Sequence, residues 1–220
     1  MSGTGTGTPS VAGSGTVQSI YDLLQDRRDI LVVSDDLIHA VNAAIRAIAK
    51  RLYVLGSDII TDHLSVSVAY AVEDEYGVLP SDFWGMKDDP YLSGYYIPLI
   101  PLPSQSVALK YTSSGYPLYY KIKGLKMFLY PPAGANYTIK GDYFKKPTLV
   151  SSVTSTVPFN ELFDEVIAEY VEIYFRGPQD KSGTTVEILG LLVKNGVDLI
   201  ATRYDRRTPT GFSQAISWGY

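Results

Sequence analysis

Three consecutive carboxylates, Glu73, Asp74 and Glu75, are the residues whose type and spacing could do acid–base chemistry. Hydrolysis of a glycosidic bond needs two carboxyl groups at a suitable separation, one acting as acid and the other as base or nucleophile. Tyrosines and a tryptophan, on which a sugar could stack, lie nearby in the sequence. The same residues form the charged turn EDEYG, and we favour this structural interpretation over a catalytic one.

Other chemistries have weaker support. Five carboxylates with no basic residue before Arg176 could suggest metal or acid–base chemistry. A run of charges on a helix is usually a solvated face, and we favour this interpretation. His39 and His63 have no second ligand at a metal-binding spacing, so we predict two structural histidines. Spacing groups no serine, histidine and aspartate into a triad. We therefore predict no catalytic, cofactor-binding or metal-binding residue; the acidic set is Glu161, Asp164, Glu165, Glu169 and Glu172.

Composition excludes several classes of protein. A chain of 220 residues, 45% of them hydrophobic, can bury a core. The net charge of -4, from 19 basic and 23 acidic residues, argues against sequence-specific DNA binding. Without cysteine there is no disulfide, thiolate nucleophile or zinc–thiolate site. No stretch approaches the roughly 20 apolar residues of a membrane span, and the N-terminus lacks a secretion-signal layout, so we expect a protein made in a cytosol.

Both ends of the chain have the composition of arms. Residues 1–16, MSGTGTGTPSVAGSGT, are typical of a flexible segment, and a phosphate-binding loop is excluded because no strand precedes it and it has no lysine. Residues 208–220 are also loose in composition but contain Phe212, Trp218 and Tyr220. Aromatic residues in such a tail are typical anchors for a pocket on a partner.

Apolar residues at helical spacing predict two helices within residues 17–55. The first has its apolar face at Val17, Ile20, Tyr21 and Leu24. The second begins at Ser34, a good N-cap, and ends before Gly56. Its predicted apolar face comprises Leu37, Val41, Ala44, Ile45, Ile48 and Leu52.

From residue 59 to 150 the pattern changes to strands and turns. In HLSVSVAYAV every second residue from Leu64 is apolar, which predicts a strand with one buried face. The three prolines of YYIPLIPLP allow only an edge or irregular strand. We predict two hairpins, one pairing VALKY with YPLYYKIKG and one pairing KMFLYP with YTIKGDYF. Twelve of the 18 tyrosines lie here, more than cross-strand packing alone explains.

Helical spacing returns in residues 158–207. Pro158 is allowed at a first helical position, and the predicted apolar face is Phe159, Leu162, Phe163, Val166 and Tyr170. Thr184 and Glu187 form a capping-box pattern that starts a last helix. Gly190 and Gly196 either weaken this helix or allow close approach; its apolar stripe is Val186, Leu189, Val193, Val197, Ile200 and Tyr204.

These elements predict an α+β fold. Helices from both ends form one bundle, and an antiparallel β region is inserted between them. We expect one domain over residues 17–207, with helices in 17–55 and 158–207 and the β insertion in 59–150.

The order of these pieces resembles the head-to-tail connector, or adaptor, proteins of tailed bacteriophages, especially those with short tails. The resemblance spans roughly Ser34 to Tyr204. It rests on a Leu-Pro-x-Asp-Phe element, a Pro-Pro hairpin that ends in Tyr-x-Lys-Lys-Pro, and the helix that follows. The matching positions are Leu79, Pro80, Asp82, Phe83, Pro131, Pro132, Tyr143, Lys145, Lys146 and Pro147.

The resemblance implies a structural protein of the virion neck, not an enzyme and without a cofactor. Such adaptors assemble in the host cytoplasm and form a ring, usually dodecameric, beneath the portal. They extend the channel for the genomic DNA, which they do not bind sequence-specifically, and provide a platform for the next tail or nozzle protein. Exposed tyrosines would supply lateral contacts, the acidic helical face would line the channel, and Phe212 to Tyr220 would dock on the portal.

Two alternative functions are also compatible with the sequence. One is a tail-associated cell-wall hydrolase that uses a pair from Glu73, Asp74 and Glu75. The other is a tail module that binds carbohydrate through its aromatic residues.

Overall fold

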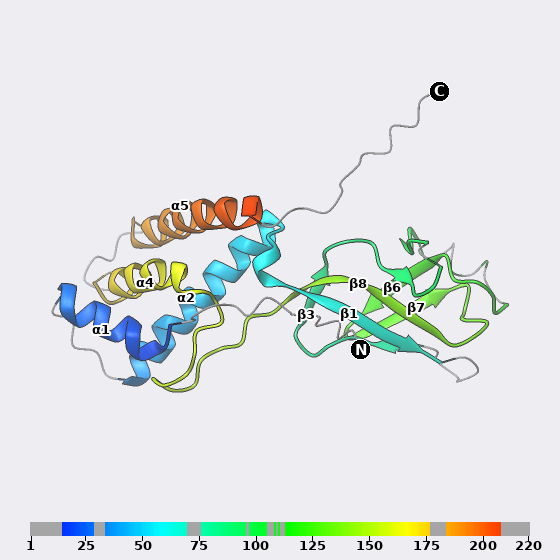
Figure 1. The fold of residues 1–220 in the computed structure, drawn as a ribbon, viewed down its shortest axis with the longest axis horizontal. Helices are drawn as coiled ribbons and strands as arrows, with labels where there is room; N and C mark the ends of the chain where they lie inside the picture. Colours follow the sequence, from blue (N-terminus) through cyan, green and yellow to red (C-terminus); the bar gives the residue numbers. More distant parts are fainter. Residues whose placement is uncertain are drawn as a thin grey trace, which may run out of the picture. The chain divides into compact units, whose positions relative to one another are not determined.

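The computed structural model describes residues 15–28, 34–69, 76–95, 97–104, 108, 110, 113–176 and 184–207. The chain divides into two compact units, a helical unit from Met1–Ile59 and Pro147–Tyr220, and a β unit from Ile60–Lys146. The β unit is therefore inserted in sequence between the two parts of the helical unit (Figure 1), which confirms the predicted α+β fold class. The single domain expected over residues 17–207 stays a prediction.

Four α-helices build the described part of the helical unit: α1 (Val17–Arg28), α2 (Ser34–Leu55), α4 (Asp164–Arg176) and α5 (Thr184–Arg207). α4 packs against the other three, and Figure 1 shows it between α1 and α5. The apolar faces predicted for α1 and α2 are confirmed, with only Tyr21 half-buried. The buried members are Val17, Ile20, Leu24, Leu37, Val41, Ala44, Ile45, Ile48 and Leu52.

Local capping ends α2 where the sequence predicts. Gly56 has a φ of +68°, and the amides of Gly56 and Ser57 donate to the carbonyls of Tyr53 and Leu52, each at 3.1 Å. This pair of bonds is the Schellman arrangement that closes a helix at a glycine. A 3-10 turn, η1 (Asp58–Ile60), then leads out of the helix.

Two polar contacts hold distant segments of the helical unit together. The buried Asn42 side chain exchanges two 2.9 Å hydrogen bonds with the backbone N–H and C=O of Val150. The Arg51 guanidinium donates to both carboxylate oxygens of Asp198, at 2.7 and 2.6 Å, and these bonds lower the pKa of Asp198. α2 is thus tied to the returning chain and to α5.

The helix predicted from Pro158 begins later than expected. The Asn160 side chain accepts a 3.1 Å hydrogen bond from the Leu162 amide and caps a 3-10 turn, η2 (Glu161–Phe163), which leads into α4. The predicted apolar face is also partly wrong, because Leu162 is 54% exposed while Ile167 and Val171 are fully buried. α4 is covered by three helices, so its buried surface is wider than one stripe; Phe159, Phe163 and Val166 are buried and Tyr170 half-buried.

The two glycines of α5 have different surroundings. A Cβ on Gly196 would lie 2.9 Å from Cγ2 of Val166, so this glycine allows α5 to approach α4 closely. A Cβ on Gly190 would meet no atom within 4 Å. The helix begins at Thr184, but the side chains of its first three residues lie outside the description. Along the predicted stripe Val193 and Val197 are buried, and Leu189, Ile200 and Tyr204 are half-buried.

The β unit consists of two sheets. In the first, β1 (Thr61–Val68), β8 (Tyr137–Lys145) and β3 (Phe83–Met86) are adjacent in that order, and β4 (Tyr91–Leu92) also pairs with β8. In the second the order is β2 (Tyr76–Val78), β7 (Lys126–Tyr130), β6 (Tyr119–Lys123) and β5 (Ile100–Pro101). These pairs are antiparallel except β5 with β6, which is parallel. The proline-rich segment is at a sheet edge, as predicted.

Both sheets contribute side chains to one apolar core. The alternation predicted in β1 is confirmed, with Leu64, Val66 and Val68 buried. They belong to the same core cluster as Met127 and Leu129 of the second sheet. Gly77 of β2 is essential for this packing, because a Cβ on it would overlap Cγ1 of Val66.

The predicted hairpins are corrected by the strand pairing. β7 and β8 do not pair with each other, since β7 lies between β2 and β6 and β8 lies in the other sheet. Pro131 and Pro132 lack the N–H that a ladder requires, so the chain leaves one sheet there and enters the other. β6 pairs with β7 across a turn at Gly124, whose φ is +62°. Most of the predicted partner VALKY lies outside the described residues.

Candidate functional site

Asp82 and Phe83 of the first family-like element lie in contact with Tyr143 of the second, inside the β unit. The Tyr143 hydroxyl donates to Oδ1 of Asp82 at 3.0 Å, and the rings of Phe83 and Tyr143 stack with centroids 5.7 Å apart. Both rings are buried. Burial, with the Asp82 hydrogen bond, raises the pKa of Tyr143 to about 12. The hydroxyl is therefore a hydrogen-bond donor and not an acid at neutral pH.

Backbone contacts fix the same cluster. The Lys146 amide donates to the Asp82 carbonyl at 2.7 Å, and the Phe83 amide donates to the Pro80 carbonyl at 3.0 Å. The Leu79 side chain is buried in the core of the β unit. Lys145 forms a 3.2 Å ion pair with Asp62. These contacts hold β3 against the end of β8, which indicates that the residues stabilise the β unit.

The remaining prolines of the pattern lie elsewhere. The Pro132 carbonyl accepts a 2.9 Å hydrogen bond from the Gly115 amide, in the segment where the chain changes sheets. Pro131 is half-buried beside it. Pro147 is the first residue of the returning part of the helical unit.

The five predicted acidic residues do not form one solvated face. Glu161 and Glu165 are exposed, and Glu169 is half-exposed. Glu172 is buried and forms a 2.9 Å ion pair with Arg176, which corrects the expectation for this residue. The cause is the wide buried surface of α4, which includes this part of the helix.

Asp164 has an environment of its own. Its Oδ1 is buried and has no hydrogen-bond partner, and its carboxylate lies so close to Gly15 that a Cβ there would overlap it. Burial, with a smaller contribution from the charge of Glu161, raises the pKa of Asp164 to about 6. Ionisation of this carboxyl group therefore lowers the stability of the helical unit.

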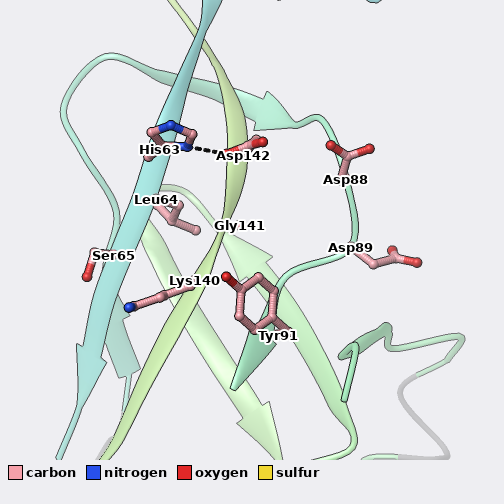
Figure 2. Close-up of a pocket in the computed structure, with 9 residues that line it drawn as sticks. All are labelled: His63, Leu64, Ser65, Asp88, Asp89, Tyr91, Lys140, Gly141 and Asp142. Atoms are coloured by element: carbon pink, nitrogen blue, oxygen red, sulfur yellow. Dashed lines mark hydrogen bonds and ion pairs between the residues drawn. The ribbon is translucent and has the colours of Figure 1, made fainter. Parts of the chain in front are cut away.

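A hollow of about 620 Å³ opens on the first sheet of the β unit. His63 and Asp142 face each other across β1 and β8, and Nδ1 of His63 lies within hydrogen-bond distance of the Asp142 carboxylate (Figure 2). Asp88 and Asp89 lie on the opposite side of the hollow. The lining residues are His63, Leu64, Ser65, Asp88, Asp89, Tyr91, Lys140, Gly141 and Asp142.

The hollow has a weak case for catalysis. The His63 side chain is 90% exposed, so its pair with Asp142 is a surface cross-strand contact. Figure 2 shows Ser65 pointing away from this pair, so the three do not make a triad. Among the residues that the structure describes, no three His, Asp or Glu side chains gather to hold a metal ion. His63 is thus paired, and His39 lies exposed on α2.

A family model settles the relationship. The family model described as SU10 adaptor protein matches residues 16–209, which include all of the described helices and strands. The chain belongs to the SU10 adaptor protein family. It is a phage head-tail adaptor, and the resemblance inferred from the sequence is confirmed. No curated protein matches it.

Membership of an adaptor family implies a structural role at the head-tail junction of the virion, with phage portal and tail proteins as partners in general terms. None of the described helices of the adaptor is long and apolar enough to cross a membrane. The candidate hydrolase residues Glu73, Asp74 and Glu75 lie outside the described residues, as do the predicted portal contacts Phe212, Trp218 and Tyr220.

Sequence reasoning missed a surface of the adaptor. Ile188, Leu191 and Leu199 of α5 are exposed although they are large and apolar. The signal was present, because these residues recur at helical spacing on the side opposite Val193 and Val197. A helix with apolar residues on two sides has one side free for another contact.

The tyrosines of the adaptor's β unit are largely accounted for by packing. Tyr95, Tyr116 and Tyr137 form an edge-to-face cluster with centroids 5.3 to 6.3 Å apart. Tyr95 is nevertheless 55% exposed, next to the exposed Ile97. Part of this aromatic surface is therefore available to a partner.

Proposed function

We propose that this adaptor forms a ring, usually of twelve copies, beneath the portal, where it extends the DNA channel and offers a platform for the next tail protein. The observation that carries the proposal is the family match over residues 16–209, which covers both units. Head-tail adaptors connect the portal with the tail, so the flanking partners follow from the family. Assembly in the host cytoplasm is part of the same proposal.

The internal packing supports a surface role. The family-like positions from Leu79 to Phe83 and at Tyr143 are used to hold the β unit together, which leaves its exposed side chains free for partners. Exposed apolar residues occur around β5, where Ile100 and Leu118 are adjacent through a 3.0 Å backbone hydrogen bond. Because Pro98 and Pro101 lack an N–H, a partner would use these side chains and not add a strand.

Negative charge would suit a channel for DNA. Glu161, Glu165 and Glu169 keep solvent contact, so in a ring they would repel phosphates and prevent the genome from sticking. The buried Glu172 is not included. We further propose that Phe212, Trp218 and Tyr220 contact the portal, because large aromatic residues are efficient anchors at interfaces.

Electron microscopy of purified portal with and without the adaptor tests the ring. The expected result is an additional ring of density beneath the portal, with its symmetry read directly from end-on averages. An adaptor that leaves purified portal unchanged, by microscopy and by sedimentation, would refute the proposal. Deletion of the gene should give heads that lack attached tails.

A matched pair of variants tests the portal contact. Phe212→Ser with Trp218→Ser should weaken portal binding strongly, whereas Val78→Ser with Leu125→Ser, two exposed residues of the β unit, should leave it within about twofold, as for residues outside the contact. A portal affinity unchanged by the first pair would remove residues 212–220 from the interface while leaving the ring itself untouched. Clearing of purified cell walls, measured by turbidity, would instead favour the hydrolase alternative.

A further inference from the structure

The outer side of α5 carries no charge over most of its length. Exposed residues recur there at helical spacing, and their exposed fractions are 46% for Ile188 and 56% for both Leu191 and Leu199. Asn195 and Thr202 complete the row. The Thr202 hydroxyl donates to the Asp198 carbonyl of the same helix at 2.7 Å, so it is already satisfied. We name these five residues the outer stripe.

α1 shows what an ordinary solvent-facing row looks like in the same unit. Its exposed residues Gln18, Asp22 and Gln25 are all polar. The Gln18 amide donates to Asp22 Oδ1 at 2.8 Å, and the Gln25 amide donates to the Tyr21 hydroxyl at 2.7 Å. Solvent exposure therefore does not by itself account for the apolar composition of the outer stripe.

The sequence that follows α5 directly has matching properties. Residues 208–220, TPTGFSQAISWGY, contain no Asp, Glu, Lys, Arg or His. The apolar residues Phe212, Ile216, Trp218 and Tyr220 occupy even positions, so an extended conformation would place them all on one side. Pro209 and Gly211 are residues that favour a turn at the start of this segment.

We propose that segment 208–220 turns back at Pro209–Gly211 and covers the outer stripe of its own α5, with Phe212 beside Leu199 and Trp218 near Leu191. No charged group loses its hydration in this contact, because neither surface carries one. The segment is joined to the end of α5, so its local concentration at the stripe is of millimolar order, which favours its own stripe over another chain's. The contact belongs to the free chain and does not require a ring, and the segment would have to leave the stripe for the same aromatic residues to contact the portal.

The lengths agree with this arrangement. Leu199 lies eight residues before Arg207, about 12 Å along a helix, and the five residues from Arg207 to Phe212 span about 17 Å when extended. Trp218 lies about 20 Å beyond Phe212 in an extended chain, whereas Leu191 and Ile188 lie about 12 and 16 Å beyond Leu199. The segment therefore reaches the whole stripe with a little slack for the turn.

Tryptophan fluorescence of the free, full-length chain tests the contact directly. The protein has two tryptophans, so Trp84→Phe leaves Trp218 as the sole reporter. We expect blue-shifted emission that acrylamide quenches weakly. Leu191→Ser with Leu199→Ser should shift the emission to the red and raise the quenching constant about threefold, because the indole loses its apolar cover. Circular dichroism should stay unchanged, since both leucines are exposed in the fold.

A matched control removes two exposed apolar residues elsewhere. Val78→Ser with Leu125→Ser, in the β unit, should leave the emission of Trp218 unchanged. The proposal is overturned if acrylamide quenches Trp218 of the parent as strongly as free tryptophan. It is also overturned if the Leu191 and Leu199 substitutions leave the emission and quenching of Trp218 unchanged. Emission that turns red on dilution also overturns it, because the stripe would then be covered by a second copy.

A second measurement does not depend on the reporter. Removal of residues 208–220 should increase binding of the dye ANS, and the same leucine-to-serine pair should abolish that increase. Truncation without any gain in dye binding would show that the segment does not cover the stripe. Binding to purified portal is scored separately, so a failure of the contact is distinguishable from a failure of the ring.

Discussion

The β unit and the helical unit are held together by different kinds of contact. In the β unit, residues far apart in sequence meet at close range, as Gly77 with Val66 and Asp82 with Tyr143. In the helical unit, helices begin and end through neighbours in sequence, such as Asn160 with Leu162 and Gly56 with Tyr53. The helical unit has distant contacts as well, Asn42 with Val150 and Arg51 with Asp198, so the contrast lies in the local capping of its helices and in the close sheet contact at Gly77.

The use of surface also differs between the units. In the β unit, the family-like residues Leu79, Phe83 and Tyr143 are buried in the core cluster, and exposed apolar residues occur at a proline-bearing edge. In the helical unit, the outer stripe of α5 is left uncharged. Prolines protect a sheet edge against pairing with a strand of another chain. An exposed apolar helix side without charges is expected to be buried by another segment. We therefore expect single substitutions to damage the β unit more, and surface substitutions to matter more in the helical unit.

The largest expected effect is in the β unit, at Gly77. Gly77→Val would force side-chain atoms into the space of Val66, whose β-branched side chain can rotate little, and should cost about 3 kcal/mol of unfolding free energy. The measurement is a urea titration followed by the fluorescence of Trp84 in β3, in a Trp218→Phe background. The midpoint should fall well below that of the parent.

Gly115→Ala is the control for this substitution. The nearest atom to a Cβ there is Cβ of Pro131 at 3.7 Å, an ordinary contact distance. Its midpoint should therefore stay close to that of the parent. Equal midpoints for Gly77→Val and Gly115→Ala would contradict the view that close sheet contact limits the β unit.

The helical unit has one buried group whose cost depends on pH, Asp164. Its pKa is raised to about 6 in the folded state, so the folded chain holds this proton more tightly than the unfolded chain. Stability is therefore lost as pH rises from about 4 to about 6, and stays lower above that range. Asp164→Asn should remove this loss and stabilise the protein by about 1–2 kcal/mol at pH 7, after allowance for partial solvent screening.

Urea titrations at several pH values measure this difference. The gap between Asp164→Asn and the parent should be small below pH 4 and should widen up to pH 6. Glu169→Gln removes a half-exposed carboxylate from the same helix and should change the unfolding free energy by less than about 0.5 kcal/mol. Parallel curves for Asp164→Asn and the parent across this range would show that the carboxyl group is not a cost.

The same contrast explains which features the sequence could predict. The apolar face of α1, the ends of α2 and the alternation in β1 were predictable, because periodicity and capping are local. The partners of β7 and β8 were not, since the segment PAGAN that follows Pro131 was interpreted as a hairpin turn when it joins two sheets. Burial of Glu172 was hidden for a related reason, because the helix faces that cover α4 come from three other segments.

The smallest expected effect compares two glycines on one helix. Gly190→Ala adds a methyl group into open space and should stabilise the helical unit by about 0.5–1 kcal/mol, because alanine restricts the unfolded chain and favours a helix. Gly196→Ala gains the same helix propensity but places its methyl group 2.9 Å from Val166, so it should be neutral or destabilising. Thermal melts followed by circular dichroism give both values. A shift of the same sign and size for the two variants would mean that α5 does not need its close approach to α4.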